Sequence, residues 1–552
     1  MKDLEIARRS PLQPIEKIAQ KLELQPEDYE PYGRHKAKLN LALTQEEKLK
    51  NARLILVSAI SPTPAGEGKT TISVGLNDGL RRIGKSSLAV LREPSLGPVF
   101  GLKGGATGGG RAQLQPMEDI NLHFNGDFAA VEKAHNLLSA AIDNHLHHRR
   151  TPLLDPRTVV WKRVMDMNDR ALRQINAGMG GRNGGVPRET GFDITAASEV
   201  MAILCLARDT ADLKERLGKI YVGQSYDKEP LYAADIGVVG AMAALLQHAL
   251  KPNLVQSLEG NPALLHGGPF ANIAQGTNTL LATRLGMSLA DYVVTEAGFG
   301  FDLGGEKFLD LKARHGGLSP RVVVLVATVR GLKYQGGTAL DQLNEPDPEA
   351  VRRGRDHLAR HLENVKRFGI TPLVAINLFT HDSEEELQAV EALCQSLSVA
   401  CERADAWGQG GAGAEKLAER AVALCEKPSQ FKPLYPLTDS LTAKIETLAQ
   451  EIYGAAEVKY SPEARKHLRQ IARLGERPWG ICMAKTEKSF SEDPQQKGAP
   501  SGHILHIRAV EVASGAGFLV PIAGSIMRMP GLPKEPAALG INLTEEGIEG
   551  LF

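Results

Sequence analysis

Cysteine is scarce in this sequence, and the few cysteines present are not spaced as paired or metal-binding cysteines are. Five occur along 552 residues, and none belongs to a Cys-x-x-Cys motif. This pattern argues against disulfides and structural zinc, and isolated cysteines usually behave as small buried apolar side chains. We therefore assign no function to Cys205, Cys394, Cys401, Cys425 or Cys482.

Long apolar runs and an excess of charge of one sign are missing as well. No apolar run approaches the roughly 18 residues needed to cross a bilayer. Lys plus Arg and Asp plus Glu both total 65, so no overall field attracts nucleic acid or anionic lipid. The N-terminal segment MKDLEIARRSPLQP lacks the apolar core of a secretory signal. We expect a soluble cytoplasmic protein that binds neither nucleic acid nor membranes.

The length exceeds what one hydrophobic core supports, so we expect two or three lobes. Short apolar runs alternate with helical patterns, which predicts an α/β fold with a P-loop-type, doubly wound, mainly parallel sheet and additional smaller lobes. Strands are expected at 54–59, 87–91, 292–295, 322–329 and 373–376, and helices at 70–82, 348–368, 383–396 and 412–427.

Two segments have the composition of boundaries between lobes, one near 149–156 and the proline-containing connector 431–436. We predict that residues 1–150 form the N-terminal part of the nucleotide-binding domain. Residues 151–430 are expected to complete the α/β core, and residues 431–552 to form a smaller C-terminal lobe.

Glycine, in contrast, is abundant and clustered. The sequence has 56 glycines, and clusters of this kind mark loops where the backbone approaches something closely. In open α/β sheets ligands bind beyond the carboxyl ends of the strands, so we expect these loops to line one crevice. The clusters lie at 104–110, 178–185, 298–305 and 408–413.

The segment PTPAGEGKTT, residues 62–71, has the features of a phosphate loop between a strand and a helix. Its glycines let backbone N–H groups face phosphates, Lys69 can reach the outer phosphates, and the Thr70 hydroxyl can bind magnesium. The alternative is a coincidental Gly-Lys-Thr at a helix start. The expected nucleotide-binding residues are Thr63, Pro64, Ala65, Gly66, Glu67, Gly68, Lys69, Thr70 and Thr71.

Details of this loop narrow the class of nucleotide protein. Thr63 stands where G-x-x-x-x-G-K-(S/T) has its first glycine, and Pro64 where one subclass has an extra lysine, so we do not expect a dimer-sandwich ATPase. The strand end at 377–380 reads NLFT and lacks the Asn-Lys-x-Asp motif of GTPases. ATP is therefore the expected nucleotide.

A second cationic loop follows the strand expected at 87–91. It carries Arg92 and Lys103 among many glycines. The planar fork of an arginine matches carboxylate or phosphate, so Arg92 could hold an acid substrate beside the terminal phosphate of the nucleotide. The alternative is a surface arginine paired with Glu93 or another acid.

Aromatic residues make up only 5% of the chain, yet three of them lie at or near expected strand ends. These three, Phe299, Phe379 and Trp407, could stack on a flat ligand ring, and ordinary packing under loops is the alternative.

The segment PMEDINLHFNGD places Asp119, His123 and Asp127 at a four-residue spacing, beside Glu118. This spacing superficially resembles a metal site, but no further ligand accompanies it. We expect a structural role for these residues, with His123 or Asp127 near a reaction centre as the alternative.

Several long segments resemble formate–tetrahydrofolate ligases. The phosphate loop, the Arg92 loop and PMEDINLHFNGD are similar to that family, and further matches follow in the same order across nearly the whole chain. These are GFDITAASEVMAILCLA from Gly191, HGGPFANIAQGTNT from His266, TEAGFGFDLGGEKF from Thr295, VATVRGLKYQGG from Val326 and CMAKTEKSFSEDP from Cys482. Ser61, where many members have threonine, and AWGQGGAG at 406–413 depart from the family pattern.

The resemblance implies an ATP-dependent ligation of formate to tetrahydrofolate through formyl phosphate, giving 10-formyltetrahydrofolate, ADP and phosphate. It implies catalytic roles for Lys69 and Arg92, and a folate site between Phe379 and Trp407 with Phe299 nearby. It also implies Mg²⁺, activation by K⁺ or NH4⁺, and a homotetramer of the monofunctional bacterial type.

Two other functions remain open from the residues alone. Another P-loop ATPase or kinase acting on a small carboxylate would use Lys69, Thr70 and Arg92 equally well, but would not need the aromatic loops. A nucleotide-controlled binding protein would bind ATP without chemistry on a second substrate. Formate- and folate-dependent release of ADP distinguishes the three.

Overall fold

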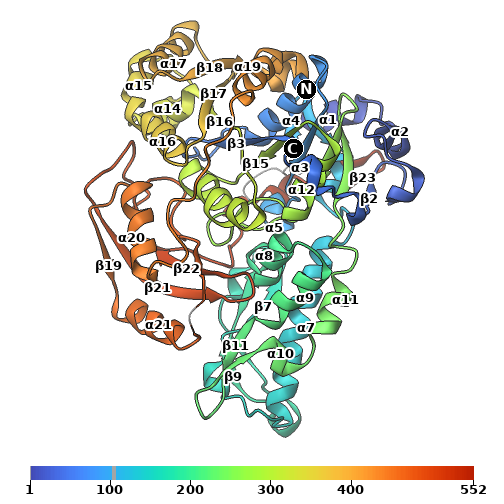
Figure 1. Cartoon of the computed structure of the whole chain (residues 1–552), viewed down its shortest axis with the longest axis vertical. Coiled ribbons are helices and arrows are strands. Elements are labelled where there is room, and N and C mark those ends of the chain that lie inside the picture. The colour runs from blue at the N-terminus through green and yellow to red at the C-terminus, as the bar shows by residue number, and fades with distance from the viewer. Residues whose placement is uncertain (1, 102–106, 476, 552) are drawn as a thin grey trace.

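The computed structural model describes residues 2–101, 107–475 and 477–551 and is built around a twelve-stranded sheet (Figure 1). The central strands of this sheet are all parallel. In spatial order they are β14 (Pro262–Leu265), β4 (Ser87–Leu91), β15 (Tyr292–Glu296), β3 (Arg53–Ala59), β16 (Val322–Ala327), β17 (Thr371–Asn377) and β18 (Ala400–Ala404).

The parallel strands other than β18 are largely apolar and buried, because helices cover both faces of the sheet. Leu54 and Leu56 of β3 belong to one hydrophobic cluster, and the intervening Ile55 and Val57 belong to another. This alternation follows the two-residue period of a strand, and it confirms the α/β class. The first cluster includes α12 (Leu280–Leu289) and α16 (Arg355–Arg367), and the second includes α4 (Lys69–Arg82) and α19 (Glu415–Cys425).

The helix expected at 383–396 is α17 (Glu384–Ser396), which Ser383 caps. The single helix expected at 348–368 is wrong, because the structure has two helices, α15 (Pro348–Arg353) and α16, that meet at Gly354. A Cβ atom at Gly354 would lie 2.5 Å from the Leu332 carbonyl oxygen. The close approach of α14 (Val329–Gln335) therefore requires glycine at this break.

Two further parts extend from the large sheet. Figure 1 shows α7, α9, α10 and α11 at the bottom of the molecule and the C-terminal strands β19, β21 and β22 at the lower left, below the large sheet. The helical part contains α7 (Asp127–His147), α8 (Glu199–Leu206), α9 (Thr210–Gly218), α10 (Ala233–Ile236) and α11 (Val239–Leu245). The C-terminal part contains α20 (Leu441–Glu451), α21 (Pro462–Ala472) and the sheet of β19 (Glu457–Tyr460), β21 (Ile504–Ala513), β22 (Phe518–Ala523) and β20 (Gly480–Ile481).

The remaining elements are short. The antiparallel edge of the large sheet comprises β1 (Tyr29–Pro31), β2 (Ala37–Leu39), β13 (Asn253–Ser257), β5 (Gly108–Gly109) and β6 (Ala112–Gln115). Small two-stranded sheets pair β7 (Arg163–Met165) with β10 (Phe192–Ile194), β8 (Ile175–Ala177) with β9 (Arg188–Thr190), β11 (Tyr221–Gln224) with β12 (Pro230–Tyr232), and β23 (Asn542–Thr544) with β24 (Gly547–Glu549). The other helices are α1 (Asp3–Arg9), α2 (Ile15–Gln20), α3 (Glu46–Leu49), α5 (Leu96–Phe100), α6 (Met117–Asn121), α13 (Arg314–Gly316) and α18 (Ala406–Gln409).

All five cysteines are free, and four of them are buried, as expected for small apolar side chains. Within the three described ranges, no helix is both long and apolar enough to cross a membrane.

Candidate functional site

The loops that carry the predicted site residues leave neighbouring strands of the large sheet at the same edge. Because the strands are parallel, their carboxyl ends lie together. The residues that follow these ends are Arg92 after β4, Phe299 after β15, the phosphate loop after β3, Phe379 after β17 and Trp407 after β18.

The phosphate loop is held in shape by one of its own acids. The Glu67 side chain is 1% exposed. Its Oε1 accepts a hydrogen bond from the Thr63 backbone N–H at 2.7 Å, and its Oε2 accepts one from the Thr328 hydroxyl. The carboxylate of Glu67 therefore stabilises the loop from inside and joins it to the start of α14.

Gly68 ends the loop in a conformation that favours glycine. Its φ is 75°, in the left-handed region, and α4 begins at the next residue, Lys69. The amide nitrogen of Asn377 donates to the Glu67 carbonyl at 3.0 Å, and a Cβ atom on Gly68 would lie 2.4 Å from that nitrogen. The strand, loop and helix predicted around Lys69 are thus present.

The nine candidate nucleotide-binding residues differ in their exposure to solvent. Thr63, Glu67 and Thr71 are buried, and Pro64 and Ala65 are exposed. Gly66, Gly68, Lys69 and Thr70 lie between these extremes.

Glu296, the last residue of β15, connects Thr70, at the end of the phosphate-loop segment, to Arg92. It is 1% exposed. The Thr70 hydroxyl donates to its Oε2 at 2.9 Å, and Nη2 of Arg92 lies 3.8 Å from its Oε1. Sequence reasoning assigned no role to Glu296, although an acid that ends an apolar strand beside a phosphate loop is a usable signal.

Arg92 does not pair with Glu93. Its Nη1 donates to the Pro269 carbonyl at 3.4 Å, and its Nε is buried without a partner in the described part of the chain. Glu93 instead accepts from the Asn253 amide at 3.0 Å, and burial together with Asp127 raises its pKa well above the ordinary value. Lys103, the other cation of this loop, lies outside the described residues.

Phe379 is linked to the phosphate loop through Arg330. The guanidinium carbon of Arg330 lies 4.0 Å from the centre of the Phe379 ring, and its Nη2 donates to the Gly66 carbonyl. One arginine therefore contacts both a predicted folate residue and a predicted nucleotide residue. Sequence reasoning did not single out Arg330.

Trp407 lies beside a different glycine loop. It is 48% exposed, and a Cβ atom on Gly110 would lie 2.6 Å from its Cγ. The strands before Phe379 and Trp407 are paired, with Asn377 opposite Ala404. The two aromatic residues therefore follow the ends of adjacent strands.

Phe299 occupies a strained position in the loop that follows β15. Its φ is 56°, which is uncommon outside glycine. At the next residue, Gly300, a Cβ atom would lie 3.3 Å from the Cα of Ser61. The loop with Phe299 is thus packed directly against the end of β3.

A family model described as formate–tetrahydrofolate ligase matches residues 1–552 of this sequence. The chain belongs to the formate–tetrahydrofolate ligase family. A ligase of that name from Sinorhizobium fredii is 56% identical over 553 residues, covering 100% of this chain and 99% of the relative. One from Staphylococcus aureus is 52% identical over 554 residues, covering 100% of both chains. The resemblance inferred from the motifs is confirmed, and the two alternative functions are not favoured.

In this ligase family member, the acids of PMEDINLHFNGD face three separate cations. Glu118 pairs with Arg8, Asp119 with Lys36 and Asp127 with Lys38, each at 2.6 Å. The His123 side chain is exposed. Among the described residues, no group of three or more His, Cys, Asp or Glu is arranged to hold a metal. These contacts support the structural role expected for the segment.

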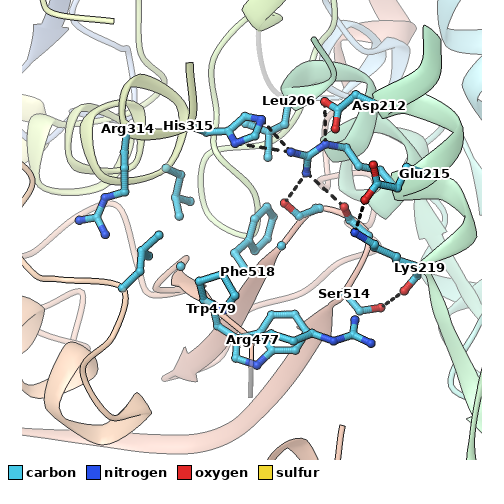
Figure 2. A pocket seen from close by; sticks show the side chains of 18 of the residues that line it. Leu206, Asp212, Glu215, Lys219, Arg314, His315, Arg477, Trp479, Ser514 and Phe518 are labelled. Atoms are coloured by element: carbon cyan, nitrogen blue, oxygen red, sulfur yellow. Dashed lines mark hydrogen bonds and ion pairs between the residues drawn. The ribbon is translucent and has the colours of Figure 1, made fainter. Parts of the chain in front are cut away.

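A cavity of about 540 Å³ lies where α9, the segment 310–315 and the C-terminal sheet meet, and none of the predicted site residues lines it (Figure 2). Arg216 lines this cavity. It donates to Asp212 at 3.1 Å, to the Ala516 carbonyl at 3.2 Å and to His315 Nε2 at 2.7 Å. Burial lowers the pKa of His315 to about 4, so that the neutral ring accepts this bond. Arg216 therefore joins three distant segments.

Proposed function

We propose that this chain, a formate–tetrahydrofolate ligase by family, joins formate to tetrahydrofolate with ATP at a P-loop-type site on the carboxyl edge of the large sheet. The observation that carries the proposal is the contact chain from Thr70 through Glu296 to Arg92. It connects the nucleotide loop to an arginine suited to formate. Both reactants would then meet at the terminal phosphate.

The chemistry has two displacements. A formate oxygen attacks the γ-phosphorus, the bond to the leaving ADP oxygen breaks, and formyl phosphate forms. The N10 amine of tetrahydrofolate then attacks the formyl carbon, phosphate leaves, and N10 loses a proton. Lys69 would neutralise charge on the transferring phosphoryl group, and the fork of Arg92 would hold formate and then formyl phosphate.

Thr70 and Glu296 fit a magnesium ion. A hydroxyl and a carboxylate supply the hard oxygen ligands that Mg²⁺ prefers beside nucleotide phosphates, and the two groups lie 2.9 Å apart. When bound, the ion would neutralise phosphate charge. Activation by K⁺ or NH4⁺ is a further part of the proposal, to be checked by assays in salts of each cation.

The folate ring would lie between Phe379 and Trp407, with Phe299 nearby. Because Arg330 covers one face of Phe379, the pterin would stack on the other face. A kinase of small carboxylates would not require these aromatic loops. We further propose a cytoplasmic homotetramer with parts at 1–150, 151–430 and 431–552. Light scattering would test the tetramer, and limited proteolysis would test the boundaries.

The test is Lys69→Met, assayed by the absorbance change of formyl-folate formation with ATP, formate or folate omitted in turn. The lysine charge should be essential to phosphoryl transfer, so the variant should lose turnover by about 10³-fold or more while keeping its circular dichroism spectrum. A folded variant with ordinary kcat would contradict the nucleotide assignment.

A further inference from the structure

The backbone N–H of Ser61, directly before the phosphate loop, is held by two histidines. The backbone N–H of Ile60, directly after β3, still donates a hydrogen bond to the sheet, to the Val326 carbonyl at 3.1 Å. The Ser61 N–H instead donates to Nε2 of His361 at 3.0 Å and to Nε2 of His357 at 3.3 Å. Both histidines project from α16, one turn apart, and both are 0% exposed.

The partners of each ring determine which nitrogen carries the proton. Nδ1 of His357 lies 2.7 Å from the Gly498 carbonyl, which only accepts, so that nitrogen is protonated and Nε2 is free to accept. An N–H only donates, so Nε2 of His361 also accepts and its proton sits on Nδ1. Burial lowers the pKa of His357 to about 4 and that of His361 well below its ordinary value. Two neutral rings thus direct lone pairs at one N–H.

This arrangement has an energetic cost that would be avoided if the two side chains only filled space in the core. Nδ1 of His361 is buried and has no partner in the described part of the chain. An unpaired buried donor is unfavourable, and an apolar side chain would avoid it. The two rings contact Phe490, at centroid distances of 5.2 Å for His357 and 4.6 Å for His361. The retained polarity points to a need for the acceptor.

The residues at the start of the phosphate loop have few other backbone N–H groups that could bond to the surroundings. Pro62 has no N–H, and the Thr63 N–H is bonded within the loop to Glu67. Gly300 presses against Ser61 from the Phe299 loop. Nearby, Lys485 and Asp302 form a fully buried ion pair at 2.9 Å. The histidines therefore supply the polar contact from outside the loop to the backbone at its start.

We propose that His357 and His361 are positioning residues that set the start of the phosphate loop, so that α16 determines where the loop faces ATP. The inference rests on the proposed function, since it takes this loop as the ATP site. Neither ring touches the nucleotide. A shift of the loop start would displace Gly66, Gly68 and Lys69 together, and sub-ångström displacement at a reaction centre is costly.

The experiment compares His361→Leu with His361→Gln, since glutamine can place a carbonyl acceptor near the position of Nε2. His135→Leu is the matched control, because His135 is also buried but contacts Ser198 at 2.8 Å in the helical part. ATP affinity is measured by calorimetry, beside kcat and the KM for ATP and for tetrahydrofolate. Each variant is first checked for folding by circular dichroism.

For His361→Leu we expect kcat/KM for ATP to fall by about 10- to 100-fold, with the KM for tetrahydrofolate nearly unchanged. His361→Gln should recover most of the loss, and His135→Leu should leave both KM values unchanged. Unaltered ATP parameters in folded His361→Leu, no rescue by glutamine, or an equal effect in His135→Leu would overturn the proposal.

If His361→Leu does not fold, His357→Leu decides. It keeps the 3.0 Å bond, so a smaller loss confined to the ATP parameters is expected, and unchanged ATP parameters would overturn the proposal. Lys69→Met is measured in parallel. Turnover retained in Lys69→Met would reject the proposed ATP site itself, whereas loss in Lys69→Met with unaltered histidine variants would reject only the positioning role.

Discussion

At the scale of single residues, adjacent positions at a strand end serve different contacts, because successive side chains leave a strand in opposite directions. Arg92 faces Glu296, whereas Glu93 faces Asn253 on β13, which lies beyond β14 in the sheet. After β16, Thr328 and Arg330 at the start of α14 bind two different residues of the phosphate loop, Glu67 and Gly66. The proposed reaction centre thus contains side chains with distinct partners.

Replacement of Arg92 by Ser should separate binding of ATP from formyl transfer. Lys69 and Thr70 remain in place, so ATP affinity measured by calorimetry should change little, while turnover falls by about 10²- to 10³-fold. Arg92→Lys should rescue poorly, because an ammonium group cannot reproduce the bidentate fork. Near-normal turnover, or an ATP affinity that falls as far as turnover does, would show that Arg92 is a structural or nucleotide residue.

Trp407→Ala should weaken folate binding selectively. The side chain is half exposed and lies against Gly110. Its loss therefore removes a stacking face. The cost in tetrahydrofolate binding should be about 1–3 kcal/mol, measured as the change in KM and in the binding constant. An unchanged folate KM together with weaker ATP binding would reverse the placement of the two subsites.

At the scale of elements, the phosphate loop depends on α14, whose first turn supplies Arg330 and whose N-cap is Thr328. The helix is itself anchored to α17 by a buried ion pair. Nζ of Lys333 lies 2.7 Å from Oε1 of Glu386, with the two side chains 1% and 0% exposed. The position of the phosphate loop therefore depends on the packing of α14 against α17.

Lys333→Met should destabilise the fold, because it leaves the buried carboxylate of Glu386 without its cation. The expected loss is about 3–5 kcal/mol of unfolding free energy, measured by urea denaturation. The double variant Lys333→Met/Glu386→Gln should recover part of it. Lys219→Met, which breaks an exposed pair with Glu215, is the control and should cost at most about 1 kcal/mol. Equal losses in the two single variants would refute this account.

At the scale of the whole molecule, the C-terminal sheet connects the other parts. Phe518 and Val520 of β22 pack in the core of the helical part, whereas Leu519 between them packs in the core beneath the large sheet. Glu199 of α8 strengthens this junction by accepting the N–H groups of Gly515 at 2.7 Å and Ala516 at 3.3 Å. The junction is thus both apolar and hydrogen-bonded.

Glu199→Gln should change the pH dependence of stability. Burial raises the pKa of Glu199 from 4.5 to about 7. Between these values the folded chain holds a proton that the unfolded chain has lost, so this group makes stability fall as pH rises. Glutamine keeps an acceptor without the titration. The variant should match the parent near pH 5 and exceed it by up to about 3 kcal/mol near pH 8.

Thermal unfolding of the variant and the parent at each pH is the measurement. A stability difference between Glu199→Gln and the parent that stays constant from pH 5 to pH 8 would show that Glu199 does not titrate in this range.

The sequence by itself determined the α/β class, the family and the loops that carry the proposed site. These depend on local properties: apolar runs of strand length, glycine beside Lys69 at a helix start, and motifs long enough to be specific. The helical pattern at 348–368 was also local, but the sequence did not show that the helix breaks. The break at Gly354 is required by the close approach of the neighbouring helix α14, not by the residues of the segment itself.

Only the tertiary structure decided which side chains meet across strands. The link from Thr70 to Arg92 through Glu296 joins the start of α4, the end of β15 and the residue after β4, which are separated by up to 226 residues. The histidines at Ser61 come from about 300 residues further along the chain. No spacing rule reaches that far, since strand order, not sequence order, sets which carboxyl ends are neighbours. The contacts that hold the phosphate loop therefore follow from how β3, β15 and β16 lie side by side, with α16 packed beneath them.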